Sequence, residues 1–240
     1  MLKGKVALVT GSAKRTGKAI ALALGREGAH VIVHFRNSEN EAAEVVQNIA
    51  DQGGTAQAIG GDLAKISEVK NIFQRIIASN GRIDILVNNV GNYLVKNIDQ
   101  TTPEEWDFLL STTVTSTFHT CHVALPYMVK QSFGRIINMA DSAADMISPW
   151  PEITPYMVGK TGVLVLTKSL AVTYAKHNIT VNAVSPGILD NSTWKPGLEN
   201  IPAGRYAQYD DINNAVLFLL KKESSYITGA NIKVTGGWMV

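Results

Sequence analysis

The chain has 240 residues, of which 45% are hydrophobic and 18% charged, and its 22 basic and 20 acidic side chains leave a formal net charge of +2. This composition excludes a disordered chain, and the balanced charge argues against a nucleic-acid or membrane-surface partner. The single cysteine cannot form an intrachain disulfide, and the apolar runs are too short to span a bilayer. We therefore expect a cytoplasmic protein. The spacing of its His and Cys residues suggests no metal site.

Short β-branched runs alternate along the chain with longer segments that carry apolar residues at helical spacing. Strands are expected at residues 5–10, 30–34, 55–59, 83–88, 134–139, 179–184 and 231–234. Because these runs are apolar without alternation, both faces of each strand should be buried. The sequence therefore predicts an α/β protein: one Rossmann-type, doubly wound domain over residues 1–240. Its seven-stranded sheet should be mostly parallel, with helices on both faces and ligands at the carboxyl ends of the strands.

A glycine-bearing turn follows the first expected strand, where the chain reads Thr10-Gly11-Ser12-Ala13-Lys14-Arg15-Thr16-Gly17. Such a turn lets backbone approach a pyrophosphate, whose charge the next helix N-terminus attracts. The spacing of Gly11 and Gly17 is not the general G-x-G-x-x-G fingerprint, so an ordinary tight turn is the alternative. The expected dinucleotide contacts in this turn are Gly11, Ser12, Lys14, Arg15, Thr16 and Gly17.

The end of the second strand indicates which dinucleotide binds. It reads His34-Phe35-Arg36-Asn37-Ser38 and lacks the acidic residue that usually holds the ribose hydroxyls of NAD. Arg36, Ser38 and His34 could instead hold a 2′-phosphate, with Arg15 as a second guanidinium nearby. We therefore expect NADPH. The alternative is that Arg36 and His34 only cap a solvated strand end.

The remaining motifs fall in a characteristic order. Asn88-Asn89-Val90-Gly91, Tyr156-x-x-x-Lys160 and Ser185-Pro186-Gly187 follow the glycine turn and Asp62. This ordered set resembles the short-chain dehydrogenase/reductase family along essentially the whole chain. The resemblance implies hydride transfer from NADPH, with Tyr156 as proton donor and Lys160 bonding the nicotinamide ribose. It also implies cofactor contacts from His34, Phe35, Arg36, Asn37, Ser38, Asp62, Leu63, Asn89, Val90, Gly91, Tyr156, Lys160, Pro186, Gly187 and Ile188.

The spacing of the Tyr-Lys pair makes chemical sense by itself. Tyr156 and Lys160 are four residues apart and share one face of a helix. A phenol with an ordinary pKa of about 10 is a poor acid–base catalyst at neutral pH. A neighbouring ammonium favours the phenolate, so we expect Lys160 to lower the pKa of Tyr156.

Two catalytic positions depart from the family pattern. The family's Ser after the fifth strand aligns with Asp141, and Ser142 stands one residue beyond. The family's helix Asn, a proton-relay element, aligns with Thr113, whose hydroxyl lacks the paired donor and acceptor of an amide. Either Asp141 or Ser142 could fill the serine role, and Thr113 leaves the relay open to question.

These departures resemble the pteridine reductases, which share the Arg15 motif, His34-Phe35 and the Asp at 141. Tyr93 would then stack on a pterin ring, and Asp141 would bond its amino-pyrimidine edge. The chain also resembles 3-oxoacyl-carrier-protein reductases, which implies a ketone substrate, and a non-catalytic NADPH-binding sensor is a third possibility. The residues expected to touch the small-molecule substrate are Arg15, Tyr93, Asp141, Trp150 and Trp194, the last of them in a lid at about residues 188–203.

Two expected helices carry apolar residues at regular spacing. These residues are Leu110, Val114, Phe118, Val163, Leu166 and Leu170. The family resemblance implies that subunits pair through these helices, usually as a homotetramer, with a homodimer as the alternative. The apolar end at residues 238–240 is expected to be buried in the same assembly.

Overall fold

The computed structural model describes residues 1–239, which contain one seven-stranded sheet in the order β3-β2-β1-β4-β5-β6-β7. The strands are β1 (Val6–Val9), β2 (His30–Phe35), β3 (Thr55–Gly60), β4 (Ile85–Asn88), β5 (Gly134–Met139), β6 (Ile179–Pro186) and β7 (Asn231–Val234). Every neighbouring pair is parallel. The predicted α/β fold with seven strands is confirmed, and the sheet is wholly parallel.

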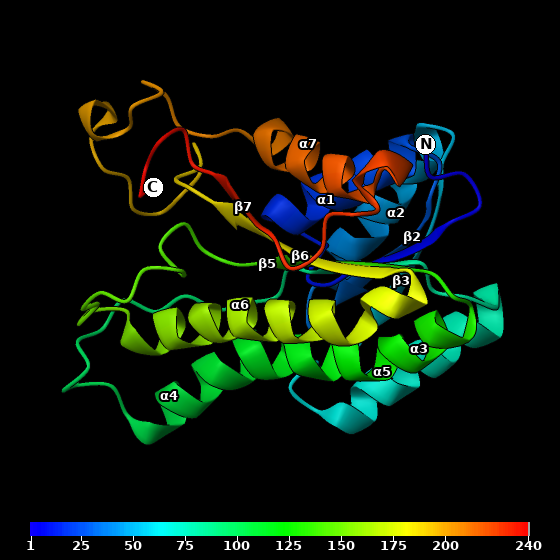
Figure 1. Ribbon diagram of the computed structural model, residues 1–240, viewed down its shortest axis with the longest axis horizontal. Helices are drawn as coiled ribbons and strands as arrows, with labels where there is room; N and C mark the ends of the chain where they lie inside the picture. Colours follow the sequence, from blue (N-terminus) through cyan, green and yellow to red (C-terminus); the bar gives the residue numbers. More distant parts are fainter. Residues whose placement is uncertain (240) are drawn as a thin grey trace.

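Two helix layers enclose this sheet (Figure 1). One layer holds α1 (Arg15–Arg26), α2 (Glu39–Asp51) and α7 (Tyr209–Leu220); the other holds α3 (Ile66–Asn80), α4 (Pro103–Leu110), α5 (Ser116–Lys130) and α6 (Thr154–Tyr174). A π-helical turn, η1 (Ser111–Thr115), joins α4 to α5, and short 3₁₀ turns are η2 (Ala175–His177), η3 (Leu198–Asn200) and η4 (Lys222–Ser224). No helix within residues 1–239 has the length and apolar character needed to cross a bilayer.

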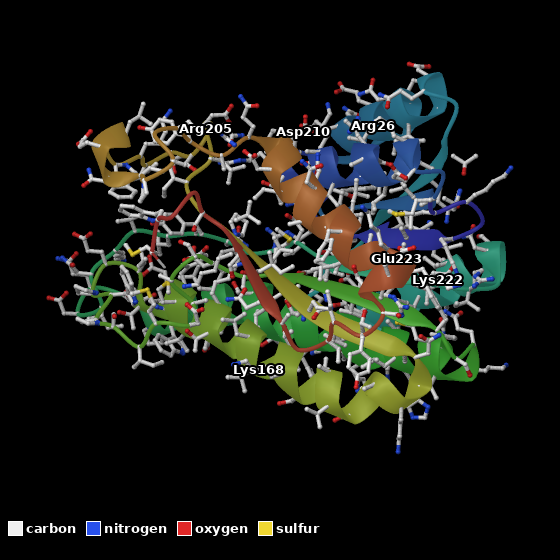
Figure 2. All side chains as sticks on the ribbon, turned by 45° about the horizontal axis from the view of Figure 1, so that its top comes forward. Arg26, Lys168, Arg205, Asp210, Lys222 and Glu223 are labelled. Atoms are coloured by element: carbon white, nitrogen blue, oxygen red, sulfur yellow. The ribbon has the colours of Figure 1, made fainter. Side chains whose placement is uncertain are left out.

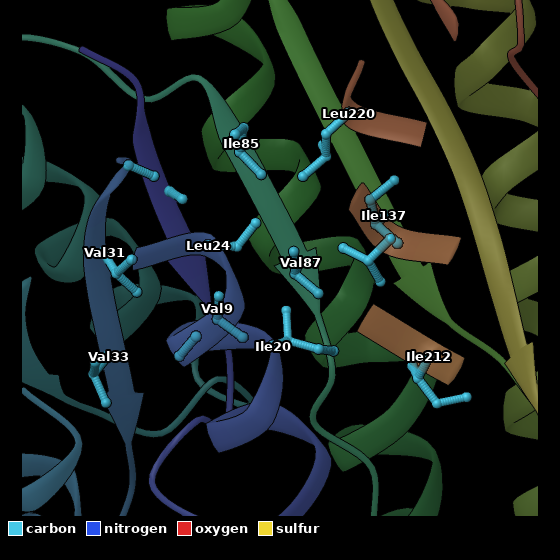
Figure 3. Packing of buried hydrophobic residues seen from close by; sticks show 14 of the residues in the cluster. Val9, Ile20, Leu24, Val31, Val33, Ile85, Val87, Ile137, Ile212 and Leu220 are labelled. Carbon is cyan, nitrogen blue, oxygen red and sulfur yellow. The ribbon is translucent and has the colours of Figure 1, made fainter. Parts of the chain in front are cut away.

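Apolar packing fixes α1 and α7 against the sheet (Figure 3). Ile20 and Leu24 of α1 and Ile212 of α7 share one buried cluster with Val87 and Ile137 of the central strands. Burying a side chain of this size stabilises a fold by about 1.5–3 kcal/mol. Because α1 begins in the glycine turn, this packing also fixes where that turn lies relative to the strand ends.

A buried polar chain ties α6 and α5 to the middle of the sheet. Asn88 Nδ2 on β4 donates to Asn138 Oδ1 on β5 at 2.8 Å, and Asn138 Nδ2 donates to Thr167 Oγ1 on α6 at 2.8 Å. Thr120 Oγ1 on α5 donates to Asn88 Oδ1 at 2.6 Å. All four side chains are buried. Since an unmade buried hydrogen bond is costly, these bonds specify the register of α6, which carries Tyr156 and Lys160.

Most charged side chains lie on the outside, and one ion pair fixes the loop that leads into α7. Figure 2 shows Lys168 on α6, Arg26 at the end of α1, and Arg205 in the loop before Asp210. Arg205 makes two bonds of 2.7 and 2.9 Å with Asp211 in the first turn of α7. This pair anchors the far end of the segment that leaves β6.

Candidate active site

The turn between β1 and α1 is closed by contacts that leave no room for a side chain. Gly11 has φ +60°, and a Cβ on Gly17 would lie 2.4 Å from the carbonyl oxygen of Gly11. Asn89 Nδ2 donates to the carbonyls of Thr10 and Gly11 at 3.0 and 3.3 Å. A tight glycine turn that leads into a helix N-terminus is what a pyrophosphate site requires, and the predicted dinucleotide fits this turn.

His34 holds this turn from inside the protein. The backbone N–H of Gly11 donates to His34 Nδ1 at 3.1 Å, which assigns the ring proton to Nε2, the atom 3.0 Å from the carbonyl oxygen of Gly61. Burial lowers the pKa of His34 to about 4, so the ring is neutral at physiological pH. The expected phosphate contact from His34 is not supported, because both ring nitrogens are already used. Ser12 is likewise buried, donating to the carbonyl of Val9 at 2.7 Å.

Two cavities at the carboxyl ends of the strands gather many of the predicted cofactor residues. A cavity of about 180 Å³, here called the adenosine cavity, is lined by residues that include Gly11, His34, Arg36, Asp62, Leu63 and Val90. A second, of about 300 Å³ and here called the nicotinamide cavity, includes Arg15, Gly91, Tyr156, Lys160, Pro186, Gly187 and Ile188 in its lining. The first suits the adenosine end of a dinucleotide and the second its nicotinamide end.

The other predicted cofactor residues lie around these cavities in different settings. Lys14 is exposed and paired with Glu41 on α2. The Phe35 ring packs against Gly60, where an added Cβ would lie 3.0 Å away, and Asn37 and Ser38 follow β2 at the surface. Thr16 stands in the first turn of α1, beside the glycine turn.

Arg15 connects the glycine turn to the segment after β6. It has φ +51°, which is uncommon for a residue with a side chain, and its guanidinium donates to the carbonyl of Asn191 at 3.2 Å. Arg15 was expected to reach substrate as well as cofactor. It lines the nicotinamide cavity but not the larger cavity described below.

Tyr156, Asp141 and Lys160 form the centre of the site. Tyr156 Oη donates to Asp141 Oδ2 at 3.0 Å, while Lys160 Nζ donates to the carbonyl of Met139 at 2.7 Å. Burial and then the Asp141 carboxylate raise the pKa of Tyr156 well above its ordinary value. Burial lowers the pKa of Lys160 to about 8. The expectation that Lys160 lowers the pKa of Tyr156 is therefore wrong, because an acid stands where the family has Ser and the ammonium is turned toward backbone.

Asp141, and not Ser142, faces the phenol. Ser142 is buried, and its Oγ lies 3.5 Å from Asp141 Oδ1. Asp141 also accepts from the backbone N–H of Ala143 at 3.0 Å, which fixes its carboxyl.

Thr113 occupies the π-helical turn η1. Its Oγ1 is buried and has no hydrogen-bond partner within the described chain. Both Thr113 Oγ1 and Lys160 Nζ lie within 4 Å of the position that a Cβ on Gly91 would take. A π-helical turn is often found at a functional site, and this one lies beside Gly91, which lines the nicotinamide cavity.

A larger cavity of about 410 Å³, here called the substrate cavity, adjoins the nicotinamide cavity. Its lining includes Tyr93, Asp141, Trp150 and Trp194, four of the five residues expected to touch substrate. The rings of Tyr93 and Tyr156 meet edge to face with centroids 4.9 Å apart. This volume is enough to enclose most of a drug-sized ligand.

Sequence reasoning missed several walls of the substrate cavity. Glu152, Ile153 and Met157 line it, as do Trp238 and Met239 from the end of the chain. Residues 238 and 239, which were expected in a subunit interface, line this cavity, and Val240 is outside the described residues. No local pattern could have found them, since only the pairing of β7 with β6 brings the chain end here.

The fold, the glycine turn and the Tyr-Lys helix define the class of protein. Residues 11–239 match the family model described as enoyl-(acyl carrier protein) reductase. The chain belongs to the short-chain dehydrogenase/reductase family, and it is an oxidoreductase of a kind that uses nicotinamide cofactors.

Particular relatives span nearly the whole chain. It is 35% identical to 3beta-hydroxysteroid dehydrogenase 1 of Eggerthella lenta, over 98% of this chain and 94% of that one. It is 36% identical to 3-oxoacyl-(acyl-carrier-protein) reductase FabG of Staphylococcus epidermidis, over 97% of this chain and 98% of that one. A solved structure from Sinorhizobium meliloti, titled as a short-chain alcohol dehydrogenase, superposes with a TM-score of 0.93 at 32% identity, covering 99% of this chain and 97% of that one.

Proposed function

We propose that the protein is an NADPH-dependent reductase that reduces a C=O or C=N bond of a ring-bearing small molecule. The observation that carries this proposal is the position of Tyr156. Its side chain lines both the nicotinamide cavity and the substrate cavity, so a substrate in one meets a cofactor in the other beside its hydroxyl. The nicotinamide supplies the hydride, and the residues of this chain supply position and a proton.

NADPH is proposed over NADH because of the residues at the end of β2. Arg36 is exposed at the rim of the adenosine cavity, and the chain next offers Asn37 and Ser38 before its first acid, Glu39. A guanidinium suits a 2′-phosphate, and an acidic residue there would repel it.

Tyr156 is proposed as the proton donor. Its hydroxyl is protonated at neutral pH, as donation to a reduced carbonyl or imine requires, although the raised pKa makes it a weaker acid than an ordinary phenol. Asp141 accepts a hydrogen bond from that hydroxyl at 3.0 Å and so fixes its orientation where the two cavities adjoin. Lys160 is proposed to exchange its bond to Met139 for one to the nicotinamide ribose.

The substrate has two candidate classes. A pteridine-like ring is favoured by Asp141 beside Tyr156 and by the Tyr93 ring at the cavity wall, which offer a hydrogen-bonding carboxylate and a stacking surface. A 3-oxoacyl ketone is the alternative, supported by the similarity to the reductase of Staphylococcus epidermidis.

Residues 188–203 are proposed as the lid, because Trp194 lines the substrate cavity yet is 58% exposed. Closure predicts a change in tryptophan fluorescence when substrate joins the cofactor complex.

The deciding experiment on the substrate class measures NADPH oxidation with a dihydropteridine and with an acetoacetyl thioester, side by side.

Tyr156→Phe tests the proton donor. It should lower kcat by about 100-fold or more while NADPH binding is retained, because only the proton is removed. Tyr226→Phe, at a fully exposed tyrosine, is the control. Turnover by Tyr156→Phe at the wild-type rate contradicts the mechanism. NADPH binding without turnover of any carbonyl or imine would favour a sensor.

We also propose that subunits pair through α5 and α6. Phe118, Val158, Val165 and Val172 are exposed on these helices, and the last three recur every seven residues on one face of α6. Val163, expected at this interface, is buried within its own chain instead. Sedimentation as a dimer or tetramer that Val165→Asp dissociates supports the pairing, and a wild-type monomer contradicts it.

A further inference from the structure

The charged side chains that line the substrate cavity are all acidic. Among the described residues that line it, Asp141 and Glu152 are acidic and no Lys, Arg or His is present. The cations nearest in sequence to the lining residues have other partners: Lys96 pairs with Glu105 at 2.7 Å, Lys160 donates to the carbonyl of Met139, and Lys195 donates to the carbonyl of Asp190 at 2.9 Å. Arg15 lines only the nicotinamide cavity of the two.

The two carboxylates affect the ionisation of the tyrosines that line the substrate cavity. The pKa of Tyr93 is raised by burial and then by the charges of Asp141 and Glu152. The pKa of Tyr156, on the opposite side of the edge-to-face contact, is raised by burial and by Asp141. The two carboxylates therefore make the potential at Tyr93 negative, whereas at Tyr156 the Lys160 ammonium, whose Nζ lies 5.8 Å from the ring centroid, opposes Asp141.

The walls of the substrate cavity are aromatic and are held in place by backbone bonds. Tyr93, Trp150, Trp194 and Trp238 all line it. The Lys96 N–H donates to the carbonyl of Glu152 at 2.7 Å, and the Ile98 N–H donates to the carbonyl of Pro151 at 2.8 Å. These bonds join the segment that carries Tyr93 to the one that carries Trp150 and Glu152. Aromatic faces attract organic cations, and carboxylates beside them strengthen that attraction.

We propose that the substrate cavity selects a planar organic cation, a ring compound whose reacting C=N bond is protonated or N-alkylated. This rests on the proposed reductase function and narrows its substrate class. In the reaction, the carbon of the C=N⁺ group gains a hydride from NADPH, its π electron pair moves to nitrogen, and a neutral amine and NADP⁺ result. An imine that arrives neutral takes one proton as well, from Tyr156 or from water.

The negative potential distinguishes this class from ketones and acyl-carrier thioesters. A ketone oxygen gains negative charge during reduction, and Asp141 stands where the family places a neutral hydroxyl, so the carboxylate opposes that charge. An imine nitrogen in the same place is favoured in its protonated form, which is the more electrophilic one. A substrate that carries a phosphate would meet two carboxylates and no cation in the substrate cavity.

The test is a binding titration followed by tryptophan fluorescence in protein saturated with tetrahydro-NADPH, a reduced analogue whose nicotinamide ring is uncharged, as in NADPH, and has no hydride to give. Three bicyclic probes of similar size are compared: N-methyl-3,4-dihydroisoquinolinium, neutral 1-tetralone and a tetralone carboxylate. The cation should bind about tenfold more tightly than 1-tetralone, and the carboxylate most weakly. Glu152→Gln should remove most of the preference for the cation and leave the Kd of 1-tetralone unchanged. Asp99→Asn, at an exposed acid outside the cavity lining, should change neither.

Equal binding of the cation and 1-tetralone, or tightest binding of the carboxylate, overturns the proposal. So does a cation preference that survives in both Glu152→Gln and Asp141→Asn. The proposed reductase function fails in a different way, through absent binding of tetrahydro-NADPH or absent NADPH oxidation. The order of the three Kd values, which can also be measured without cofactor, decides the charge preference in either case.

Discussion

The two sides of the site are built differently. The cofactor side rests on the ends of β1, β2, β4 and β6 and on backbone that glycines expose, with His34 and Asn89 binding the turn from behind. The substrate side is walled by loops from separate parts of the chain, among them the stretches around Tyr93, Trp150 and Trp194 and the end at Trp238. Regular structure fixes the first side, whereas contacts between loops, among them the backbone bonds from Lys96 and Ile98 to the Pro151–Glu152 segment, fix the second. A change to the first should therefore be felt by every substrate, and a change to the second by some substrates only.

The strongest challenge to the cofactor side is Gly17→Ala. The new Cβ would lie 2.4 Å from the carbonyl oxygen of Gly11, so the turn must move away from the cofactor. We expect the Kd for NADPH to rise about 1,000-fold, or about 4 kcal/mol, by isothermal titration calorimetry. The control is Gly53→Ala, where φ is +77° and a Cβ meets nothing within 4 Å. It should cost some stability and leave NADPH binding intact. NADPH binding by Gly17→Ala at the wild-type Kd would show that the turn does not hold the pyrophosphate.

A second test uses the buried histidine behind that turn. The pKa of His34 is lowered from 6.5 to about 4, so between these values the unfolded chain binds a proton that the folded chain does not. The neutral ring's contribution is therefore fully present above pH 6.5 and is lost as pH falls toward 4. Urea unfolding should show a loss of about 3 kcal/mol over that window.

His34→Gln is the matched variant for this effect, since it cannot gain the proton. It should be less stable than the wild type at pH 7 and should have a flatter dependence of unfolding free energy on pH. An equally steep dependence in the variant would assign the effect to other groups.

The smallest of the three effects concerns the choice of cofactor. Arg36→Glu removes the guanidinium proposed for the 2′-phosphate and adds a repelling charge at the rim of the adenosine cavity. NADPH affinity should fall about tenfold while NADH affinity is kept or improved. Arg75→Glu, with the same charge change at an exposed site on α3, should alter neither. Equal losses for both cofactors would mean that Arg36 supports the fold and not the phosphate.

The same contrast explains how far the sequence could be read. The strands were predicted within two residues, and the central ones are the continuous apolar runs that burial on both faces requires. The edge strands β3 and β7 are only partly buried, because each has a neighbour on one side only. The glycine turn and the Tyr156–Lys160 pair were found because their spacing along the chain is itself the signal. The direction of the pKa shift of Tyr156 was predicted wrongly, since that pKa depends on how deeply the side chain is buried and on where the Asp141 carboxylate lies. Glu152 and Trp238 were missed because nothing near them in sequence reveals a shared cavity.

The position of Trp238 and Met239 has a practical consequence for how the enzyme is handled. Lys233 Nζ donates to the carbonyl of Met239 at 2.8 Å, which holds the end of the chain against the substrate cavity. A purification tag on the carboxyl side would follow residues that line the substrate cavity, whereas one on the amino side would precede Met1, whose amino group pairs with Glu27. Substrate profiles measured with the two tag placements are therefore not interchangeable, and the amino-terminal placement is the one to use when specificity is compared.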